Sequence, residues 1–381
     1  MSSEVQDGKV GILTIMHTCN YGAELQAYAL CSAIGALGYD CELIDYGCPT
    51  VDDREIPHPP RLRAIRHPKG YLVSWLVLEE RKRKHEAFLA FTNAAMRCGS
   101  KVSCESAIAA NYSTVVVGSD QTWNGPVTGW DYTFLLDDQV SDGLRKLAYA
   151  ASFGDMQIGE EERGLYRRAL AKFEALSTRE GSGVGTIAEL GIQGARHVLD
   201  PTLLLGGDEW SELAVASDVE GPYVLVYFMA EHEHTLALAR RAAEELGAQL
   251  VAVNWFAVRK QPDIIFRNAA SPAEFLGLVA GAEMVVTSSF HGTCFSILFE
   301  KNFRCVLKEG VERGRSRIAE LVDALGLQDA CLAAGEQAAD LAPVDYAQPR
   351  QKLQQLRGES LAFLEAALRG DESVRVRVEG E

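Results

Sequence analysis

Short apolar and β-branched runs alternate with longer helical stretches along most of this chain. In its first half the runs at 10–16, 41–44, 115–117, 147–152, 176–178 and 197–199 predict strands, and the stretches at 23–37, 84–96 and 160–175 predict helices. This alternation is typical of βα units on a parallel sheet, because each helix returns the chain to begin a strand in the same direction. We therefore expect an α/β fold.

A second series of βα units follows a link at 203–207. It predicts strands at 223–229, 249–253 and 284–287 and helices at 236–246, 292–299 and 351–368. Ser271 and Glu274 form a capping box with Pro272 at the first helical position, so another helix begins there. Because 381 residues exceed one ordinary core, we expect two Rossmann-like domains, 1–205 and 206–381, the second closed by the C-terminal helix.

Composition narrows the class of protein. Hydrophobic residues make up 47% and charged residues 24%, as in a soluble globular protein, and the formal net charge is -16. That charge argues against nucleic-acid binding, which needs a basic face. We find no signal peptide and no apolar run long enough to span a membrane, and nine scattered cysteines fit a reducing setting, so we expect a cytoplasmic protein.

One basic segment stands out in this acidic chain. The insertion at about 51–84 begins with a stretch at 51–70 that has no clear period. Its part at 54–84 carries nine cationic residues against Glu55, Glu79 and Glu80: Arg54, Arg61, Arg63, Arg66, Lys69, Arg81, Lys82, Arg83 and Lys84. Beside the apolar stretch at 71–78, it predicts peripheral contact with an anionic membrane, near a lipid-linked glycan. The alternative is a solvated insertion whose apolar part packs inward.

Polar or glycine-containing clusters follow six of the predicted strands. They lie at 17–22, 118–124, 152–154, 179–182, 200–201 and 288–292. In open parallel sheets, ligands bind outside the carboxyl ends of the strands, so five clusters would line that edge of the first sheet and the sixth that edge of the second. If the two sheets face a central cleft, all six share one site. Turn-forming residues alone would explain the Gly and Asp, but not the Trp, Arg and His.

These clusters also carry a resemblance to a family. The strings are Asn20-Tyr21-Gly22-Ala23-x-Leu25-Gln26, Gly118-Ser119-Asp120-Gln121-x-Trp123-Asn124, Tyr149-Ala150-Ala151-Ser152-Phe153-Gly154, Ser177-x-Arg179-Glu180, Asp200-Pro201-Thr202 and Ser289-Phe290-His291-Gly292. Together they resemble the polysaccharide pyruvyl transferase family over about 10–327. The resemblance implies two Rossmann-like domains arranged as in GT-B glycosyltransferases. It also implies transfer of a pyruvyl group from phosphoenolpyruvate to sugar hydroxyls as a ketal, with no cofactor or metal.

The chemistry of that donor suggests roles for Arg179 and His291. Phosphoenolpyruvate carries a phosphate and a carboxylate, and the guanidinium of Arg179 can fork onto either. The alternative for Arg179 is an ion pair with a helix carboxylate such as Glu174. Ketal formation requires protonation of the enol methylene, for which the His291 imidazolium is a candidate general acid. The alternative for His291 is a buried ring satisfied by the backbone.

The remaining candidates surround these two residues. Asp120, with Glu180 as the alternative, is a candidate base for the accepting hydroxyl, although Asp120 is also suited to an Asx-turn. The other candidates for substrate binding are Asn20, Ser119, Gln121 and Asn124 at sugar hydroxyls, Trp123 stacked on a sugar or packed between domains, and Ser289, Gly292 and Thr293 at the start of a helix, where free N–H groups bind anions.

The chain departs from some family branches at Ser289, where those branches have an arginine. Arg313, Arg315 and Arg317 are candidates to replace its charge, or they form a solvated basic face. Residues 231–234, Glu-His-Glu-His, resemble a metal cluster, but a helix start in solvent explains them better. Two other functions remain open: a GT-B-like nucleotide-sugar glycosyltransferase, and a non-catalytic glycan-binding relative.

Overall fold

The computed structural model describes residues 8–59, 75–137, 143–227, 233–254, 261–336, 338 and 340–379. Its chain divides into two compact units, which we describe separately. Unit 1 comprises Met1–Glu55, Asn93–Leu205 and Leu353–Glu381, and unit 2 comprises Ile56–Thr92 and Gly206–Lys352. Each unit contains one six-stranded parallel sheet, so the predicted α/β class is confirmed.

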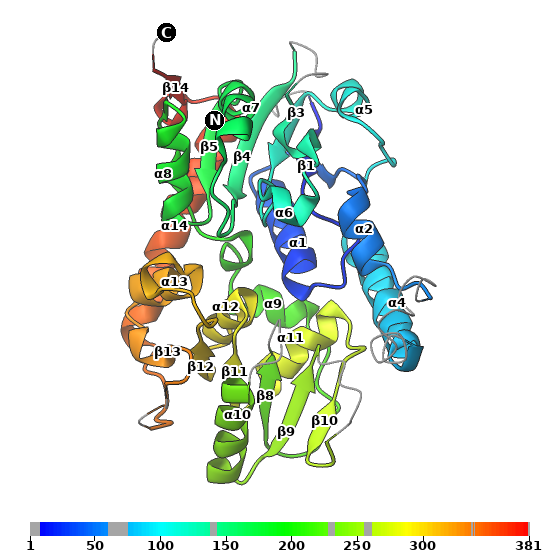
Figure 1. Cartoon of the computed structure of the whole chain (residues 1–381), viewed down its shortest axis with the longest axis vertical. Coiled ribbons are helices and arrows are strands. Elements are labelled where there is room, and N and C mark those ends of the chain that lie inside the picture. The colour runs from blue at the N-terminus through cyan, green and yellow to red at the C-terminus, as the bar shows by residue number, and fades with distance from the viewer. Residues whose placement is uncertain are drawn as a thin grey trace. The chain divides into compact units, whose positions relative to one another are not determined.

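The sheet of unit 1 has the strand order β2-β1-β3-β4-β5-β7 (Figure 1). Its strands are β1 (Val10–Leu13), β2 (Cys41–Leu43), β3 (Thr114–Val117), β4 (Arg145–Ala151), β5 (Ala175–Thr178) and β7 (Arg196–His197). The order changes direction between β1 and β3, and this switch point is where open α/β sheets leave a crevice for a ligand. A short antiparallel pair joins β6 (Ile192–Gln193) to β14 (Arg377–Val378).

Helices cover both faces of this sheet, because its strands are apolar on both sides. One face packs on α1 (Tyr21–Ala36) and the end of α14 (Ala347–Arg369), through side chains that include Leu30, Ile34 and Leu364. The other face packs on α2 (Pro49–Glu55), α5 (Glu105–Asn111), α7 (Glu160–Leu170) and α8 (Gly181–Glu189). Short turns complete the unit: α6 (Gly125–Thr128), η2 (Tyr132–Leu135), η3 (Pro201–Leu203) and η6 (Glu372–Val374).

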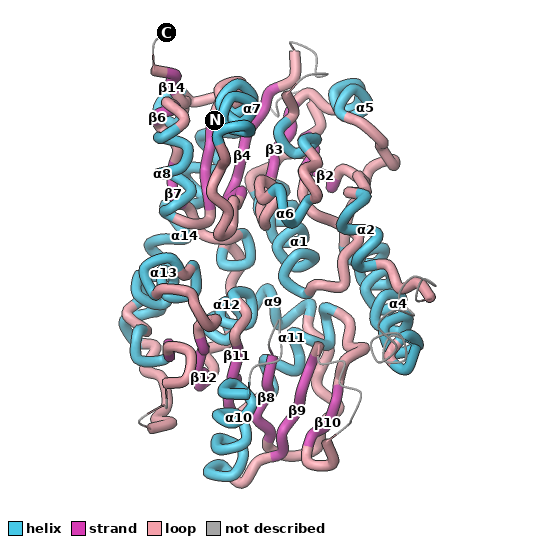
Figure 2. The backbone as a smooth tube through the Cα atoms, viewed as in Figure 1, coloured by secondary structure: helices cyan, strands magenta, loops and turns pink. Residues whose placement is uncertain are grey.

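The sheet of unit 2 has the order β10-β9-β8-β11-β12-β13, which places its switch point between β8 and β11. Its strands are β8 (Tyr223–Tyr227), β9 (Gln249–Val253), β10 (Ile264–Phe266), β11 (Met284–Thr287), β12 (Asn302–Val306) and β13 (Cys331–Leu332). Along the chain, helices separate β8 from β9, β10 from β11 and β11 from β12, as Figure 2 shows. The helical elements are α9 (Gly207–Leu213), α10 (Glu233–Leu246), α11 (Pro272–Gly281), α12 (Phe290–Leu298), α13 (Arg317–Leu325), η4 (Arg313–Arg315) and η5 (Gln328–Ala330).

Packing in unit 2 also uses both faces of the sheet. Apolar side chains of α10 pack on β8, β9 and β11. Elsewhere in the unit, aromatic pairs join the helices, with Trp210 of α9 meeting Phe295 of α12 edge to face at a centroid distance of 5.1 Å. The predicted capping box is confirmed, since the Ser271 hydroxyl accepts the Glu274 N–H and the Glu274 carboxylate accepts the Ser271 N–H.

The units differ from the predicted domains 1–205 and 206–381 in two places. Residues 56–92 group with unit 2, because they contain most of α4 (Leu78–Ala95), whose Lys84 ammonium donates to Asn254 at 2.7 Å. Residues 353–381 group with unit 1, because the apolar face of α14 packs on its sheet. The change at Leu205 falls within the predicted link at 203–207. The predicted cleft between the sheets stays a prediction.

Candidate active site

The carboxyl ends of β3, β5 and β7 in unit 1 bring three carboxylates around Arg179. The Arg179 guanidinium donates Nη1–H to Asp200 Oδ2 at 3.0 Å and Nε–H to Glu180 Oε1 at 3.2 Å. Its Nη2 lies 3.5 Å from Asp120 Oδ1. The Arg179 side chain is only 1% exposed, whereas that of Asp120 is 13% exposed. We call these four residues the Arg179 cluster.

Charge in the Arg179 cluster is mutually compensated. Burial alone would lower the pKa of Arg179, but the carboxylates of Glu180, Asp200 and Asp120 raise it above its ordinary value. The predicted binding of the donor by Arg179 stays a prediction, because its guanidinium already pairs with three carboxylates in this structure. Its partners are carboxylates of the loops, whereas Glu174 pairs with Arg145.

Hydrogen bonds from neighbouring loops fix the cluster. Ser152 Oγ donates to Glu180 Oε1 at 2.7 Å, and Asp200 Oδ1 accepts the N–H of Thr202 at 3.0 Å. Ser119 Oγ lies 3.0 Å from the Ala150 carbonyl oxygen and 3.4 Å from Asp200 Oδ2. Ser119 is fully buried, so its side chain holds the loop and offers no hydroxyl to a sugar.

Asp120 differs from its neighbours because it keeps some access to solvent. Its backbone lies in the left-handed region at φ 64°, and its carbonyl accepts the N–H of Thr122 at 2.8 Å and of Ser152 at 3.0 Å. These bonds hold the loop through the main chain of Asp120. Its carboxylate faces Arg179, so the predicted Asx-turn is not what positions it.

The rest of the 118–124 loop is occupied by packing. Trp123 is 1% exposed, lies in the core of unit 1 and donates Nε1–H to the Phe134 carbonyl at 3.2 Å. Asn124 Nδ2 donates to Gln121 Oε1 at 2.8 Å. Both predicted roles for Trp123, sugar stacking and packing between domains, are therefore wrong, and the amides of Gln121 and Asn124 bind each other.

Asn20 directly precedes α1, and its side chain bonds to the first turn of this helix. Its Oδ1 accepts the Gly22 N–H at 2.9 Å, as the N-cap of the helix. Six residues on, Gln26 is fully buried, accepts the Ser119 N–H at 3.1 Å and donates to Thr14 Oγ1 at 2.9 Å. Gln26 thus ties the loop after β3 to the end of β1.

In unit 2, His291 lies at the switch point of the sheet. The chain leaves β11 at Thr287, whose hydroxyl donates to the Tyr227 carbonyl at the end of β8 at 2.5 Å. Ser289 caps α12, accepting the Gly292 N–H at 3.3 Å. His291 follows in the first turn, 8% exposed, with its ring edge to face with Phe290 at 5.3 Å.

Two details of this turn bear on the predicted anion site. The Thr293 N–H donates to the Ser289 carbonyl at 3.0 Å, so the prediction that Thr293 offers a free N–H is wrong. Glycine is required at position 292 for a steric reason, because a Cβ there would lie 2.4 Å from Thr287 Oγ1 and 2.9 Å from a Tyr227 ring carbon. Only glycine lets α12 approach β8 and β11 this closely.

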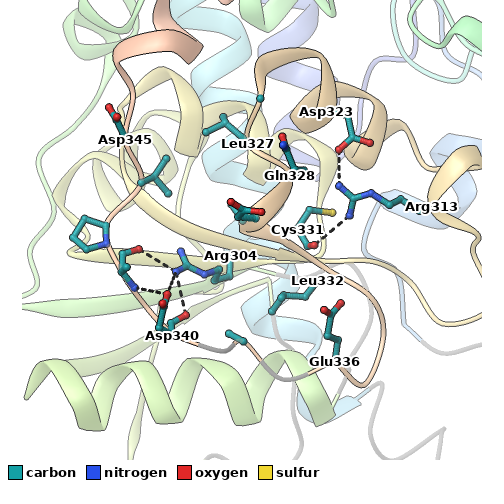
Figure 3. A pocket seen from close by; sticks show the side chains of 17 residues that line it. Arg304, Arg313, Asp323, Leu327, Gln328, Cys331, Leu332, Glu336, Asp340 and Asp345 are labelled. Carbon is teal, nitrogen blue, oxygen red and sulfur yellow. Dashed lines mark hydrogen bonds and ion pairs between the residues drawn. The ribbon is translucent and has the colours of Figure 1, made fainter.

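Of the three arginines proposed to replace the missing cation, Arg317 contacts the turn that carries His291. Its guanidinium carbon lies 5.6 Å from the Phe290 ring centroid. Arg313 instead lines a separate pocket of about 1150 Å³ within unit 2, where it binds the Cys331 carbonyl at 3.3 Å and pairs with Asp323 (Figure 3). The backbone of Arg315 lies in η4, and its side chain lies outside the described part of the chain.

Asp200, Ser152 and Gln26 belong to the family strings, but the sequence predicts no role for any of them. Asp200 and Ser152 are polar residues at apolar strand ends and Gln26 is a polar residue within α1, and the structure shows that they hold the Arg179 cluster and its loop. Among the described residues, no group of three His, Cys, Asp or Glu side chains is arranged to hold a metal ion. Of the predicted cluster at 231–234, Glu233 and His234 begin α10, and 231–232 lie outside the described residues.

Comparisons with solved structures give distant likenesses. A Listeria monocytogenes protein proposed to be a UDP-N-acetylglucosamine 2-epimerase aligns with 9% identity and a TM-score of 0.49, covering 95% of each chain. The UDP-GlcNAc 2-epimerase of Methanocaldococcus jannaschii aligns with 12% identity and a TM-score of 0.43, covering 93% of this chain and 92% of its own. The ADP-heptose LPS heptosyltransferase II of E. coli aligns with 10% identity and a TM-score of 0.37, covering 94% of this chain and 100% of its own. Because the TM-scores are below 0.5, these likenesses are too distant to indicate a function.

A search of curated proteins found no match. A family model described as polysaccharide pyruvyl transferase matches residues 20–307. That segment includes the Arg179 cluster of unit 1 and the His291 turn of unit 2, together with the strands from β2 to β12. The chain therefore belongs to the polysaccharide pyruvyl transferase family, and it is a glycan-modifying transferase.

Proposed function

We propose that this protein transfers the pyruvyl group of phosphoenolpyruvate to two hydroxyls of a glycan or glycan precursor, forming a ketal and releasing phosphate. The observation that carries the proposal is the family match, because it spans the residues whose chemistry the reaction needs. The reaction is balanced without a cofactor. Two hydroxyls lose protons, the enol methylene gains one to become a methyl group, and the released phosphate leaves with the other.

His291 is the proposed general acid for the enol carbon. Its position at the switch point of unit 2 is where parallel sheets bind ligands, and its burial limits competing proton exchange with water. Arg317, packed on Phe290, is the proposed cation for an anionic group of the donor. This assignment replaces Arg179, whose charge is already compensated, and Arg313, which faces another pocket.

Asp120 is the proposed base for one acceptor hydroxyl. Arg179 lies beside its carboxylate and orients it, while Glu180 is more deeply buried and accepts from both Arg179 and Ser152. In this assignment, Arg179 and Glu180 are positioning residues. Their task is to keep one partly exposed carboxylate at the carboxyl edge of the sheet.

The proposal is tested by supplying phosphoenolpyruvate together with a panel of glycan acceptors. Acceptor-dependent phosphate release, with a pyruvyl ketal detected on the glycan by mass spectrometry, is the expected result. A parallel panel of nucleotide sugars tests the glycosyltransferase alternative, for which nucleotide release is the signature. Glycan binding without either release would identify a non-catalytic relative and overturn the proposal.

His291→Gln tests the assigned acid. Gln keeps approximate size and hydrogen-bonding capacity but cannot deliver a proton near neutral pH. We expect turnover to fall by about 10²–10⁴ while donor affinity stays within about tenfold. His234→Gln, at an exposed position on α10, is the matched control. Equal loss of binding and turnover would make His291 a phosphate ligand, and retained turnover would remove it from the mechanism.

We also propose that the protein works in the cytoplasm and contacts anionic membrane through α4. Trp75 and Leu76, just before this helix, are 46% and 61% exposed, and the basic residues Arg81 to Arg83 follow in its first turns. Exposed apolar side chains followed closely along the chain by basic ones suit an anionic lipid surface. None of the described helices is long and apolar enough to cross a membrane.

A further inference from the structure

A histidine–aspartate pair lies at the carboxyl ends of β1 and β2 in unit 1. His17 follows β1 and Asp45 follows β2, and His17 Nε2 lies 2.8 Å from Asp45 Oδ1. Their side chains are 27% and 26% exposed, so both are anchored in the protein yet reachable from solvent. If Nε2–H donates to Asp45, the neutral tautomer has its proton-accepting lone pair on Nδ1.

The backbone at His17 is held in an uncommon conformation. Its φ of 59° lies in the left-handed region, which residues other than glycine adopt at a cost of about 1–3 kcal/mol. Immediately after it, the Thr18 N–H donates to Glu24 at 3.3 Å and the Cys19 N–H to Glu55 at 3.4 Å. These bonds fix the loop, so the imidazole is held at the edge of the sheet beside the switch point between β1 and β3.

Acidic groups of several elements surround the pair. Asp45 lies after β2, Asp52 and Glu55 on α2, and Glu24 on α1, with Lys101 as the cation close to Asp52. Burial raises the pKa of Asp52, while the charges of His17 and Lys101 oppose that rise. Asp52 Oδ1 is buried without a hydrogen-bond partner among the described residues. These surroundings suit an imidazole that gains positive charge during a reaction.

We propose that His17 is a second general base of the pyruvyl transfer, oriented by Asp45, and that it deprotonates an acceptor hydroxyl. The inference rests on the proposed function, which requires two hydroxyls to lose protons while Asp120 serves one of them. As the hydroxyl oxygen forms its bond to C2 of the donor, its proton passes to His17 Nδ1. The imidazolium then returns the proton to the phosphate as the C2–O bond to phosphate breaks. His17 precedes the matched segment 20–307, so the family model does not include it.

The test uses His17→Asn in the full chain. Asparagine tolerates the left-handed backbone, so the loop keeps its conformation, but its amide cannot accept the proton. We expect turnover to fall by about 10²–10³ with donor affinity unchanged. The pH profile of the variant should also differ from that of the parent, because the variant lacks an ionisable side chain at this position. His58→Asn, at an exposed position, is the control and should match the parent.

Asp45→Asn provides an independent readout, because it keeps an acceptor for Nε2–H but removes the charge that stabilises the imidazolium. Its turnover should fall by at least about tenfold, with donor affinity unchanged. Full turnover in His17→Asn, or reduced turnover with the parent's pH profile, would show that the pair is only structural. If the parent itself releases no phosphate with any acceptor, the proposed function fails and this inference falls with it.

Discussion

The Arg179 side chain shows how its neighbours change what a residue can do. In the sequence it is a cation at the end of a strand. In the fold its guanidinium is buried and faces Asp120, Glu180 and Asp200. Since the carboxylates already satisfy its charge, an incoming phosphate would have to compete with all three. Its main effect is therefore on the stability and orientation of the carboxylates.

Arg179→Met tests this effect on the stability of unit 1. Removing the cation leaves the buried carboxylates of Glu180 and Asp200, and the partly exposed carboxylate of Asp120, without compensation. We therefore expect the free energy of unfolding to fall by about 3–5 kcal/mol. Chemical denaturation of parent and variant measures this difference.

Arg97→Met is a suitable control for this measurement. Arg97 pairs with Asp40 at 2.9 Å in unit 1, but the two side chains are 66% and 52% exposed, so solvent screens the pair. We expect the free energy of unfolding to change by close to zero. An equally small change in the free energy of unfolding for Arg179→Met would show that the buried cluster does not stabilise the fold. The role of Arg179 would then have to be sought in substrate binding.

At the scale of the element, the α12 turn depends on one close approach. Gly292→Ala would place a methyl group against Thr287 and Tyr227, which are held by the sheet. We expect α12 to shift and the free energy of unfolding to fall by about 1–3 kcal/mol. Gly164→Ala in α7 is the control, because a Cβ there meets nothing within 4 Å, and it should gain up to about 1 kcal/mol. Thermal unfolding that ranks the two variants in the opposite order would contradict this account.

Helix α4 carries the membrane hypothesis, and the structure alters it. Lys84, one of the predicted basic residues, is 2% exposed and bound to Asn254, so it belongs to the core of unit 2. Arg61, Arg63, Arg66 and Lys69 lie outside the described residues. We expect the parent to bind phosphatidylserine vesicles at low salt. The variant with Arg81, Lys82 and Arg83 changed to Gln should not bind them. Cosedimentation measures this, and a parent that stays in the supernatant would end the hypothesis.

At the scale of the whole molecule, unit 1 is assembled from three separate segments of chain. Its last segment supplies Leu364, which is 1% exposed against the sheet. Leu364→Ala should lower the free energy of unfolding by about 2–5 kcal/mol. Gln354→Ala, exposed on the same helix, should have little effect. In Leu364→Ala, hydrogen exchange should become faster in peptides of β1, β4 and α1, while β8 to β12 stay protected. Faster exchange in unit 2 instead would contradict the packing of α14 on the sheet of unit 1.

The sequence by itself determined the class of fold. Periodicity located most strands and the main helices, because burying one face of a helix and both faces of a parallel strand leaves a pattern in the chain. It also located the capping box at Ser271 and Glu274, whose contacts are local. The family strings indicated which strand ends carry chemistry, and the family match confirms the family they resemble.

Only the tertiary structure decided how those residues are used. Whether Arg179 meets a substrate or Asp200, and whether Trp123 faces solvent or the core, depends on residues distant in sequence. The same holds for His17, whose partner Asp45 follows the next strand, and for α14, whose apolar face packs on the sheet of unit 1. Periodicity gives the direction of a side chain within its own element, but the partner it meets is set by strand order, which the local pattern does not encode.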